Sequence, residues 1–258
     1  MSADGRLRTD GRRTPLADEH FASRLCTLDV RLDLLGRSPL FVGLPPPDVM
    51  TVSRLFRERS YDEGQAIYRA GEPAQRLYVV ATGKVKLERT TASGHSVLLD
   101  ILTSGEFFGS LSMLGEATYR ESAVAQTACC VLAVAADGFL AILHRYPPVA
   151  LAALELVAAR LRAAHESMEH QSVQSAEGRI AALLLKLGEK LGEANQDALL
   201  IQMPLSRQDL ADMAGTSVET ASRIMSRFRK DGLVHSGRRW VAITDGVRLA
   251  NIAEDRQV

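Results

Sequence analysis

The spacing of apolar residues changes twice along the chain, and each change marks a different kind of element. Apolar residues recur at helical intervals over Phe21–Phe41, and a helix entered by prolines is predicted over Asp48–Phe56. Over Arg57–Ala136 short runs of β-branched and aromatic residues alternate with glycine turns, which predicts a compact all-β roll or barrel. A small barrel of this kind can hold one ligand in its interior. After Pro147 the helical spacing returns.

One long helix is predicted over Pro147–Val173. Its apolar positions alternate three and four residues apart through more than three heptads, which is the spacing of a coiled-coil seam. We expect this seam to join two copies of the chain, and the alternative is that the same face packs on its own β-roll. Glu177–Gly178 is expected to break the helix and act as a hinge, and Arg179–Glu193 to form the next helix. The seam positions are Leu151, Leu154, Ala158, Leu161, His165 and Met168.

The string LSRQDLADMAGTSVETASRIMSRFRKDG has the pattern of two short helices joined by a tight turn. Ser206 is placed to cap the first helix, with Asp209 at the capping-box position three residues later. Gly215 should end that helix, and Thr216 or Ser217 should cap the second. The string LVHSGRRWVAI then predicts two short strands, which would add a β-wing. The whole pattern predicts a winged helix–turn–helix, whose second helix enters the major groove of DNA.

The exposed side of that second helix carries side chains suited to the edges of base pairs. Glu219 can accept a hydrogen bond from the amino group of cytosine, and Arg223 can donate two hydrogen bonds to guanine. The alternative is an ordinary helical hairpin in a protein core. The residues expected to contact DNA are Ser206, Arg207, Ser217, Val218, Glu219, Thr220, Ser222, Arg223, Arg227 and Arg229.

Composition changes this picture only locally. The 258 residues suit two domains, and 31 basic against 31 acidic residues give no net charge. Bulk charge therefore does not mark a nucleic-acid partner, although residues 217–232 carry a small basic excess. Residues 1–20 are polar and rich in arginine, which predicts a disordered tail. No apolar run approaches the roughly 20 residues of a membrane span, so we expect a cytoplasmic protein without membrane contact.

The sequence encodes no recognisable catalytic or metal motif. It has no nucleophile–base pair at diagnostic spacing, no phosphate-cradling loop and no metal motif, so neither an enzyme nor a metal site is predicted. Its three cysteines form no CxxC, so a disulfide framework and a zinc site are not expected. Cys129 and Cys130 are neighbours in an apolar run, and strand geometry would place them as buried thiols on opposite faces.

Four strings together resemble the CRP/FNR family of bacterial transcription regulators: GEPAQRLYVVATGKVKL, SGEFFG, GRIAALLLKL and the helix–turn–helix string above. The resemblance covers about Leu40–Ile252. It implies an α+β fold with an N-terminal double-stranded β-roll of the cyclic-nucleotide-binding type, a long dimerisation helix and a C-terminal winged helix–turn–helix. The sensor domain would cover residues 21–146, the dimerisation helix residues 147–176 and the DNA-binding domain residues 177–258.

Within that family, the string VETASR resembles the FNR-like branch, including its nitric-oxide-responsive members. This resemblance implies an inverted repeat close to TTGA(T/C)-N4-(A/G)TCAA, with Val218 and Ser222 against a thymine. It also implies a homodimer on double-stranded promoter DNA that contacts RNA polymerase, as an activator rather than a repressor. The β-roll would sense a small molecule or a redox signal.

The resemblance also places an effector pocket on the β-roll and the long helix. Where cAMP-binding relatives have a Glu, an Arg–Ser pair and a Thr–Ser pair, this chain has Ser110, Arg120–Glu121 and Ala164–His165. The Glu121 carboxylate would repel a phosphate, which argues against cAMP. The alternative function is a cAMP-responsive regulator, or a cyclic-nucleotide-binding regulatory subunit of another protein. The candidate pocket residues are Gly109, Ser110, Leu111, Arg120, Glu121, Ala164 and His165.

The family resemblance also raises two cofactors, an iron–sulfur cluster and haem. Only Cys26 lies in the N-terminal region, so one chain cannot supply the closely spaced thiolates of an iron–sulfur cluster. His165 lies on the seam at the level of the effector pocket, where an imidazole could serve as a haem ligand or a proton switch. The alternative is a seam histidine that lies at the solvent edge or is hydrogen-bonded, without a ligand. The sequence leaves the effector unknown, with haem as one candidate.

Overall fold

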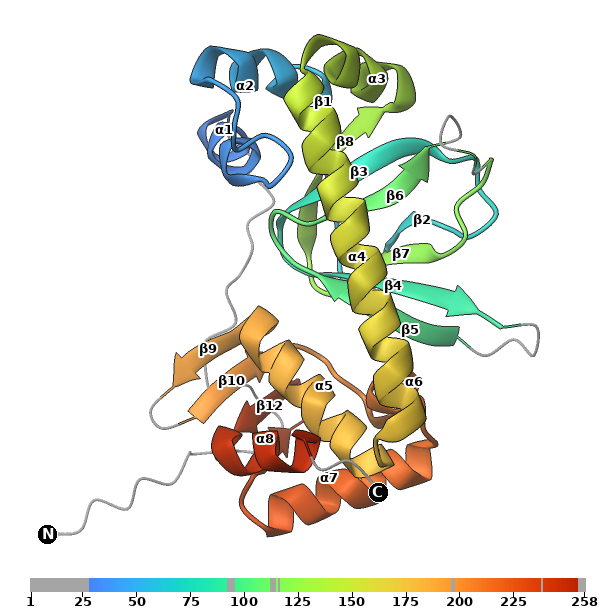
Figure 1. Ribbon diagram of the computed structural model, residues 1–258, viewed down its shortest axis with the longest axis vertical. Coiled ribbons are helices and arrows are strands. Elements are labelled where there is room, and N and C mark those ends of the chain that lie inside the picture. Colours follow the sequence, from blue (N-terminus) through green and yellow to red (C-terminus); the bar gives the residue numbers. More distant parts are fainter. Residues whose placement is uncertain are drawn as a thin grey trace, which may run out of the picture. The chain divides into compact units, whose positions relative to one another are not determined.

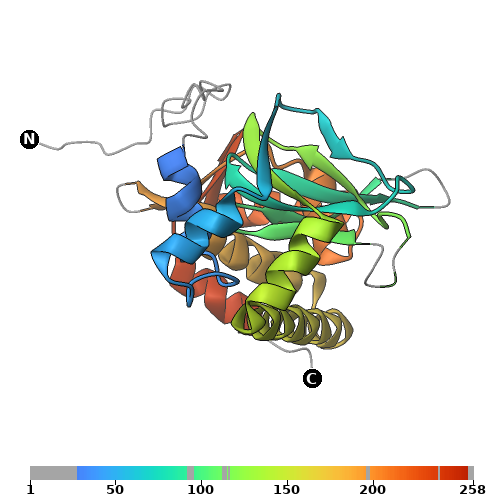
Figure 2. The same ribbon diagram turned by 90° about the horizontal axis from the view of Figure 1, so that it is seen from above.

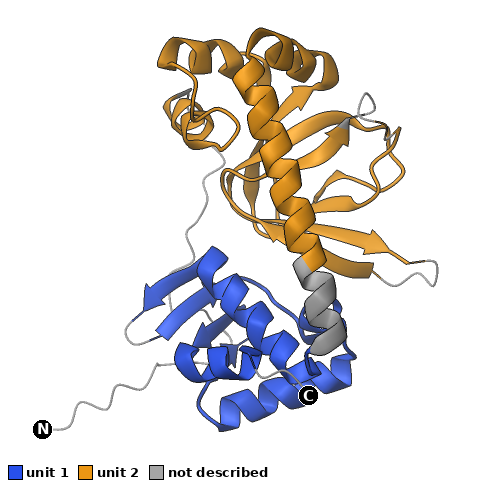
Figure 3. Ribbon diagram, in the orientation of Figure 1, with its two compact units in different colours: residues 1–20, 167–258 blue, residues 21–166 orange. Residues whose placement is uncertain are grey.

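The computed structural model (Figure 1 and Figure 2) describes residues 28–91, 96–111, 115, 117–195, 198–237 and 239–254. The chain divides into two compact units between residues 166 and 167, within one long helix (Figure 3). The tail predicted over residues 1–20 lies outside the described residues. Each unit is described below by itself, in chain order: the first is residues 21–166 (orange, unit 2 in Figure 3), and the second begins at residue 167 (blue, unit 1 in Figure 3).

Two four-stranded sheets form the β-roll of the first unit. Their strand orders are β1-β8-β3-β6 and β2-β7-β4-β5, and neighbouring strands are antiparallel. The predicted all-β roll is therefore confirmed. The strands are β1 (Phe56–Tyr61), β2 (Ala66–Tyr68), β3 (Gln75–Thr82), β4 (Val85–Thr90), β5 (Ser96–Leu102), β6 (Phe107–Leu111), β7 (Ser122–Ala125) and β8 (Cys129–Ala135).

The first sheet is buried on both faces, and this explains the uninterrupted apolar sequence of β8. On one face, Leu132 and Val134 pack in a cluster with Phe139 and with the N-terminal helices. On the other face, Val131 packs in a cluster with side chains of the second sheet, such as Val85. The helices of this unit are α1 (Leu28–Arg37), α2 (Pro46–Ser53), α3 (Ala136–Arg145) and α4 (Pro147–Val173). Both sheets lie on the same side of α4 (Figure 1 and Figure 2).

The second unit contains four helices and a four-stranded antiparallel sheet among its described residues, with strand order β11-β12-β10-β9. Helix α5 buries Ile180, Leu184 and Leu187, as its apolar spacing predicts. The elements are α5 (Ala176–Leu191), β9 (Gly192–Asn195), β10 (Ala198–Gln202), α6 (Arg207–Ala214), α7 (Val218–Lys230), β11 (Val234–Gly237), β12 (Trp240–Ile243) and α8 (Gly246–Glu254).

The break after α4 differs from the predicted hinge at Glu177–Gly178. Helix α4 ends at Val173 as predicted, but α5 already begins at Ala176. The Ser175 side chain caps α5 by accepting a hydrogen bond from the Gly178 amide, at 3.0 Å. Glycine is tolerated there because the cap satisfies its amide, so the expectation that Glu177–Gly178 breaks the helix was wrong.

Two N-terminal helix predictions are also corrected in their bounds. The described helix within Phe21–Phe41 is α1, which starts at Leu28, and residues 21–27 lie outside the described part. Helix α2 begins at Pro46 rather than at Asp48, because proline fits the first helical turn, where an amide needs no intrahelical partner. It ends at Ser53, and Phe56 opens β1 instead.

The two neighbouring cysteines of β8 point to opposite faces, as predicted. Cys129 belongs to the cluster between the sheets, and Cys130 to the cluster beneath the helices. Cys129 is a free, buried thiol, whereas Cys130 is disulfide-bonded. The expectation of a thiol at both positions was therefore wrong, since an odd number of cysteines still permits one bond.

No single described helix has both the length and the apolar composition needed to cross a membrane. A bent pair, α3 with residues 147–165 of α4, meets that test jointly, with a bend of 114°. In the described part of the chain, no group of three or more His, Cys, Asp and Glu side chains is placed to hold a metal ion.

Candidate nucleic-acid interface and effector site

Helix α6 begins and ends where the sequence predicts. The Ser206 hydroxyl accepts a hydrogen bond from the Asp209 amide (3.0 Å), and the Ser206 amide donates to the Asp209 carboxylate (2.7 Å). These two bonds form the predicted capping box. Gly215 ends the helix in the left-handed conformation, at φ 60°. The turn between the two helices is therefore set by local chemistry.

Helix α7 is capped by Ser217, one of the two residues proposed for that role. Its hydroxyl accepts a hydrogen bond from the Thr220 amide at 3.2 Å. The inward positions Ala221, Ile224, Met225 and Phe228 are all buried. This buried face fixes the rotation of α7 and leaves the predicted base-reading face outside.

The predicted base-reading residues lie together on the first two turns of α7. Val218, Glu219 and Arg223 are exposed, and Ser222 is half-buried. Residues three and four positions apart share one side of a helix, so these side chains form one surface. An exposed carboxylate beside an exposed guanidinium can pair with a donor and with acceptors on neighbouring bases.

A second group of predicted contacts lies where α6 begins, beside the wing. Arg207 donates a hydrogen bond to the Ser236 hydroxyl of β11, at 3.1 Å. Burial, and then the nearby positive charge of Arg229, lowers the pKa of Arg207. Two guanidinium groups beside the positive end of a helix dipole are suited to a phosphate.

Arg227, another predicted DNA contact, takes part in an ion pair within the protein. Its guanidinium forms an ion pair with Glu177, in the first turn of α5, although the Arg227 side chain remains 52% exposed. Both residues belong to the second unit. A charge expected to face DNA is thus engaged by a carboxylate of the protein.

Arg179 is a positioning residue that the sequence prediction missed. Its guanidinium donates hydrogen bonds to the carbonyl oxygens of Ala214 (2.8 Å), Gly215 (3.2 Å) and Gln174 (2.7 Å). Two of these oxygens belong to the end of α6 and the turn that follows it. An arginine near the start of the largely apolar string GRIAALLLKL was a signal for this role.

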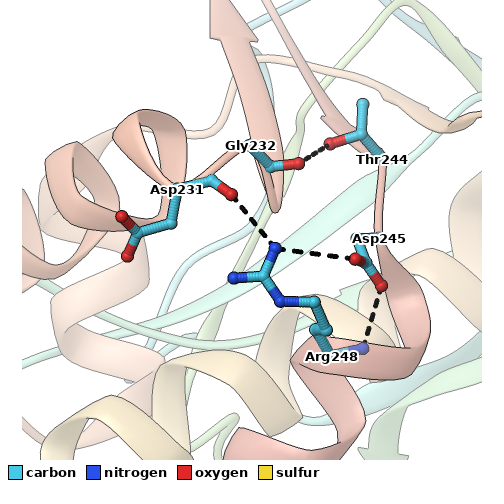
Figure 4. A network of polar contacts seen from close by, with 5 residues as sticks. All are labelled: Asp231, Gly232, Thr244, Asp245 and Arg248. Carbon is cyan, nitrogen blue, oxygen red and sulfur yellow. Dashed lines mark hydrogen bonds and ion pairs between the residues drawn. The ribbon is translucent and has the colours of Figure 1, made fainter.

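The C-terminal end of α7 is also held by side chains (Figure 4). Arg248 donates to the carbonyl oxygen of Asp231 at 3.3 Å and lies 3.8 Å from the Asp245 carboxylate, which in turn accepts the Arg248 amide. Thr244 donates to the carbonyl oxygen of Gly232 at 2.7 Å. The recognition helix is therefore fixed at both ends within its own unit.

Strand β6 carries the first residues of the candidate effector pocket. Gly109 has φ 88°, and a Cβ there would lie 2.8 Å from the Arg76 carbonyl oxygen of β3, so only glycine suits this close approach. Ser110 pairs opposite Arg76 and is half-buried. The side chain of Leu111 lies outside the described residues.

The other roll residues of the candidate pocket differ in exposure. Arg120 is exposed, whereas Glu121 is half-buried. Burial, and then the Glu121 carboxylate, raises the pKa of Tyr68, so Glu121 lies close to that ring. Tyr68 stacks on Tyr119 with the ring centroids 3.8 Å apart, and its hydroxyl is buried. These two tyrosines were missed, although one directly precedes Arg120.

Helix α4 presents the remaining pocket candidates to solvent. Ala164 and His165 are exposed. One turn before them, Arg160 donates a hydrogen bond to the carbonyl oxygen of Phe107 on β6. Arg160, which the sequence prediction also missed, thus joins α4 to the strand that carries Gly109.

The predicted seam of α4 is not covered by its own β-roll. Leu151, Leu154 and Leu161 are 63%, 67% and 54% exposed, and Val157 beside them is 64% exposed. Other residues of α4, such as Leu156, pack on the core instead. The alternative of a seam packed on its own roll is wrong for these residues. Ala158 and His165 are exposed as well, and the side chain of Met168 lies outside the described part.

Comparison with known proteins gives the family. Residues 58–146 match the cyclic nucleotide-binding domain, and residues 178–252 match the Crp-like helix-turn-helix domain. The chain is 37% identical over 217 residues to the Cyclic AMP receptor protein of Thermus thermophilus, covering 84% of this chain and 97% of that protein.

The chain belongs to the CRP/FNR family. It is a DNA-binding transcription regulator of that type, and such regulators bind promoter DNA and typically act as dimers. Its fold is similar to the structure of FixK2 from Bradyrhizobium japonicum, with a TM-score of 0.67 and 28% identity over 76% of this chain and 96% of that one. The predicted fold class is confirmed.

The relatives of this CRP/FNR regulator do not show whether it belongs to the cAMP receptor branch or to the FNR-like branch. Besides the Thermus protein, they include the Transcriptional activator protein FnrL of Cereibacter sphaeroides, which is 28% identical over 81% of this chain and 85% of that protein. The FNR-like branch inferred from VETASR therefore stays a prediction.

Proposed function

We propose that this CRP/FNR chain acts as a homodimer on an inverted repeat in promoter DNA, with one α7 in the major groove of each half-site. The observation that carries the proposal is the exposed pair Glu219 and Arg223 on a helix whose opposite face is buried. Guanine offers two acceptors to an arginine, and cytosine offers one donor to a carboxylate. The sequence TTGA(T/C)-N4-(A/G)TCAA is the proposed target, through the likeness of VETASR to the FNR-like branch.

The backbone contacts would come from both sides of the reading face. Arg207 and Arg229 are close enough for one charge to lower the pKa of the other residue, and a phosphate between them would relieve that repulsion. The α6 N-terminus adds the positive end of its dipole. Such contacts orient α7 on the duplex without reading its sequence.

The exposed seam of α4 supports dimerisation. Four large apolar side chains, three of them from the predicted heptad, are more than half exposed in the single chain. Pairing two such helices would remove this apolar surface from water. A two-fold axis along the pair would place two reading helices on half-sites about 34 Å apart.

Regulation would be a shift between two arrangements of the units. An effector bound by the β-roll would favour one arrangement, and the chain would pivot at the break between Val173 and Ala176. A small molecule or a redox change would be the signal. The bound dimer would then activate transcription through contact with RNA polymerase, in the cytoplasm where the promoter lies.

A cAMP-responsive regulator is the second candidate function, because the Thermus relative carries that name. The residues here fit the nucleotide poorly. Ser110 has no carboxylate for a ribose hydroxyl, and the half-buried Glu121 would repel a phosphate. Haem at the exposed His165 is a further candidate, and we do not propose an iron–sulfur cluster.

The test is a fluorescence-anisotropy titration of the purified full-length protein on two duplexes at fixed salt. One duplex carries TTGAT-N4-ATCAA and the other a scrambled sequence of equal length. We expect tighter binding to the inverted repeat, and equal affinity for both duplexes would contradict the proposal. Repeating the titration with excess cAMP tests the cAMP-responsive candidate, which requires a change in affinity for the inverted repeat. A Soret band after haem is added to the protein would show that haem binds.

A further inference from the structure

One positive charge of the recognition helix is already paired within the protein. The Arg227 guanidinium of α7 forms an ion pair with the Glu177 carboxylate of α5. The two side chains are 52% and 30% exposed, so the pair lies at the surface, where a phosphate group could reach it.

Arg227 lies on the same side of α7 as the base-reading residue Arg223. Arg227 follows Arg223 by four residues, so the two side chains lie one turn apart on the same side of the helix. Arg223 is exposed on the base-reading face. With the first turns of α7 in the major groove, as proposed, a side chain one turn farther along that side would lie near the phosphate-lined wall of the groove.

Glu177 is held firmly in place by the backbone that carries it. Ser175 caps the helix through the Gly178 amide, and Gln174 donates to the carbonyl oxygen of Ala253 in α8, at 2.7 Å. A Cβ on Gly178 would lie 3.2 Å from the carbonyl oxygen of Ile252, so the start of α5 is packed closely on α8. These contacts fix the backbone at the start of α5, and so the point from which the Glu177 side chain reaches Arg227.

We propose that Glu177 sets the affinity for DNA by competing with the phosphate backbone for Arg227. This inference rests on the proposed DNA-binding function. While Arg227 is paired with Glu177, its charge cannot neutralise a phosphate and release counterions from DNA. Because this contribution does not depend on sequence, the pair weakens binding to every duplex by the same factor. Base reading by Glu219 and Arg223 is left unchanged, since neither side chain takes part in the pair.

The test is a double-mutant cycle with Glu177→Gln, Arg227→Gln and the double variant in the full-length protein. Affinity for the inverted repeat and for the scrambled duplex is measured over a range of about 50 to 300 mM salt. We expect Glu177→Gln to raise affinity for both duplexes roughly 3–10-fold near 0.1 M salt. The slope of log affinity against log salt concentration should become more negative by about 0.9, which corresponds to one more phosphate contact. In the Arg227→Gln background the same substitution should change affinity less than about 2-fold.

The matched control is Glu189→Gln, which removes the same charge from an exposed position near the other end of α5. Thermal unfolding of each variant shows whether its fold is kept. Equal effects of Glu177→Gln and Glu189→Gln would overturn the inference, as would equal effects of Glu177→Gln with and without Arg227.

The failure of this inference and the failure of the proposed function give different results. If the wild type binds both duplexes equally, the proposed site-specific function fails, but the cycle on scrambled DNA still decides the role of Glu177. Absence of binding to either duplex at low salt would contradict both.

Discussion

Two arginines of α7 are suited to different tasks because they lie on different sides of the helix. Arg223 is exposed beside Glu219, among the predicted base contacts. Arg229 lies near Arg207, whose pKa its charge lowers, beside the wing residue Ser236. A two-bonded contact with guanine distinguishes bases, whereas a contact with phosphate does not.

Substitution of these arginines should therefore have different effects. Arg223→Ala should cost about 1–3 kcal/mol of binding free energy at the inverted repeat and relax the preference for guanine. Arg229→Ala should weaken binding to all duplexes by the same factor. It should also make the slope of log affinity against log salt concentration shallower by about 0.9. Anisotropy titrations on duplexes with single base changes measure both effects. An Arg223→Ala variant with unchanged base preference would contradict the assignment.

Cys129 makes the stability of the β-roll depend on pH. Burial raises the pKa of its thiol from 9.0 to about 12. Between these values the unfolded chain has lost the proton while the folded chain retains it, so the free energy of unfolding falls as pH rises. Below pH 9 this contribution is fully present.

We expect Cys129→Ala to flatten this loss of stability between about pH 9 and 12. Denaturant unfolding of the wild type and the variant across that range provides the measurement, and thiolate absorbance follows the titration directly. Titration of the Cys129 thiol near pH 9 in the folded protein would refute the expectation.

At the scale of elements, the first turn of α5 and the residue before its cap together connect the other three helices of the second unit. Arg179 binds the end of α6, Glu177 pairs with α7, and Gln174 binds the end of α8. The helix–turn–helix is thus held against α5 by polar contacts as well as by its apolar core. Movement at the break after α4 would be passed to α7 through this turn.

Arg179→Gln should loosen the turn between α6 and α7. Loss of the guanidinium leaves the carbonyl oxygens of Ala214 and Gly215 without this donor, which should lower the free energy of unfolding by about 1–3 kcal/mol. Arg248→Gln is the comparison, because Arg248 donates to one carbonyl oxygen at the longer distance of 3.3 Å. Denaturant unfolding should show the larger loss for Arg179→Gln, and an equal or smaller loss would refute its proposed role.

The elements with strong local signals could be predicted from the sequence. Helices α6 and α7 have capping side chains and a left-handed glycine, and α4 has an unbroken heptad pattern. The helix break lies before Ala176 rather than at Glu177–Gly178, because the cap of Ser175 keeps Gly178 helical. Local signals decide where a helix begins and ends, and here the Ser175 cap sets the start of α5 despite Gly178.

The parts of the candidate site that depend on tertiary contacts could not be predicted. The pairing of Arg227 with Glu177 and the bonds of Arg179 join residues on different helices. Sequence spacing within one helix carries no information about such partners. The exposed face of α7 was predictable because it depends only on helical period and burial.

At the scale of the whole molecule, the proposed function requires two chains. The exposed Leu151, Leu154 and Leu161 are a surface that a second α4 would cover. A single chain reads one half-site, and affinity for an inverted repeat comes from holding two readers at fixed separation.

A charge in this seam should therefore separate the chains. We expect Leu161→Glu to give a monomer in light scattering and to lose the affinity advantage of two half-sites over one. Leu140→Glu is the matched control, because Leu140 is 37% exposed on α3 and lies outside the seam. A Leu161→Glu variant that remains dimeric would move the interface elsewhere.

The central claim is that α7 reads bases through Glu219 and Arg223. Selection of binding sites from random duplexes by the purified wild type, repeated with Arg223→Ala, tests it most directly. We predict that the wild type enriches an inverted repeat with guanine in each half-site and that Arg223→Ala loses that guanine. No enriched repeat, or the same guanine selected by both proteins, would contradict the claim.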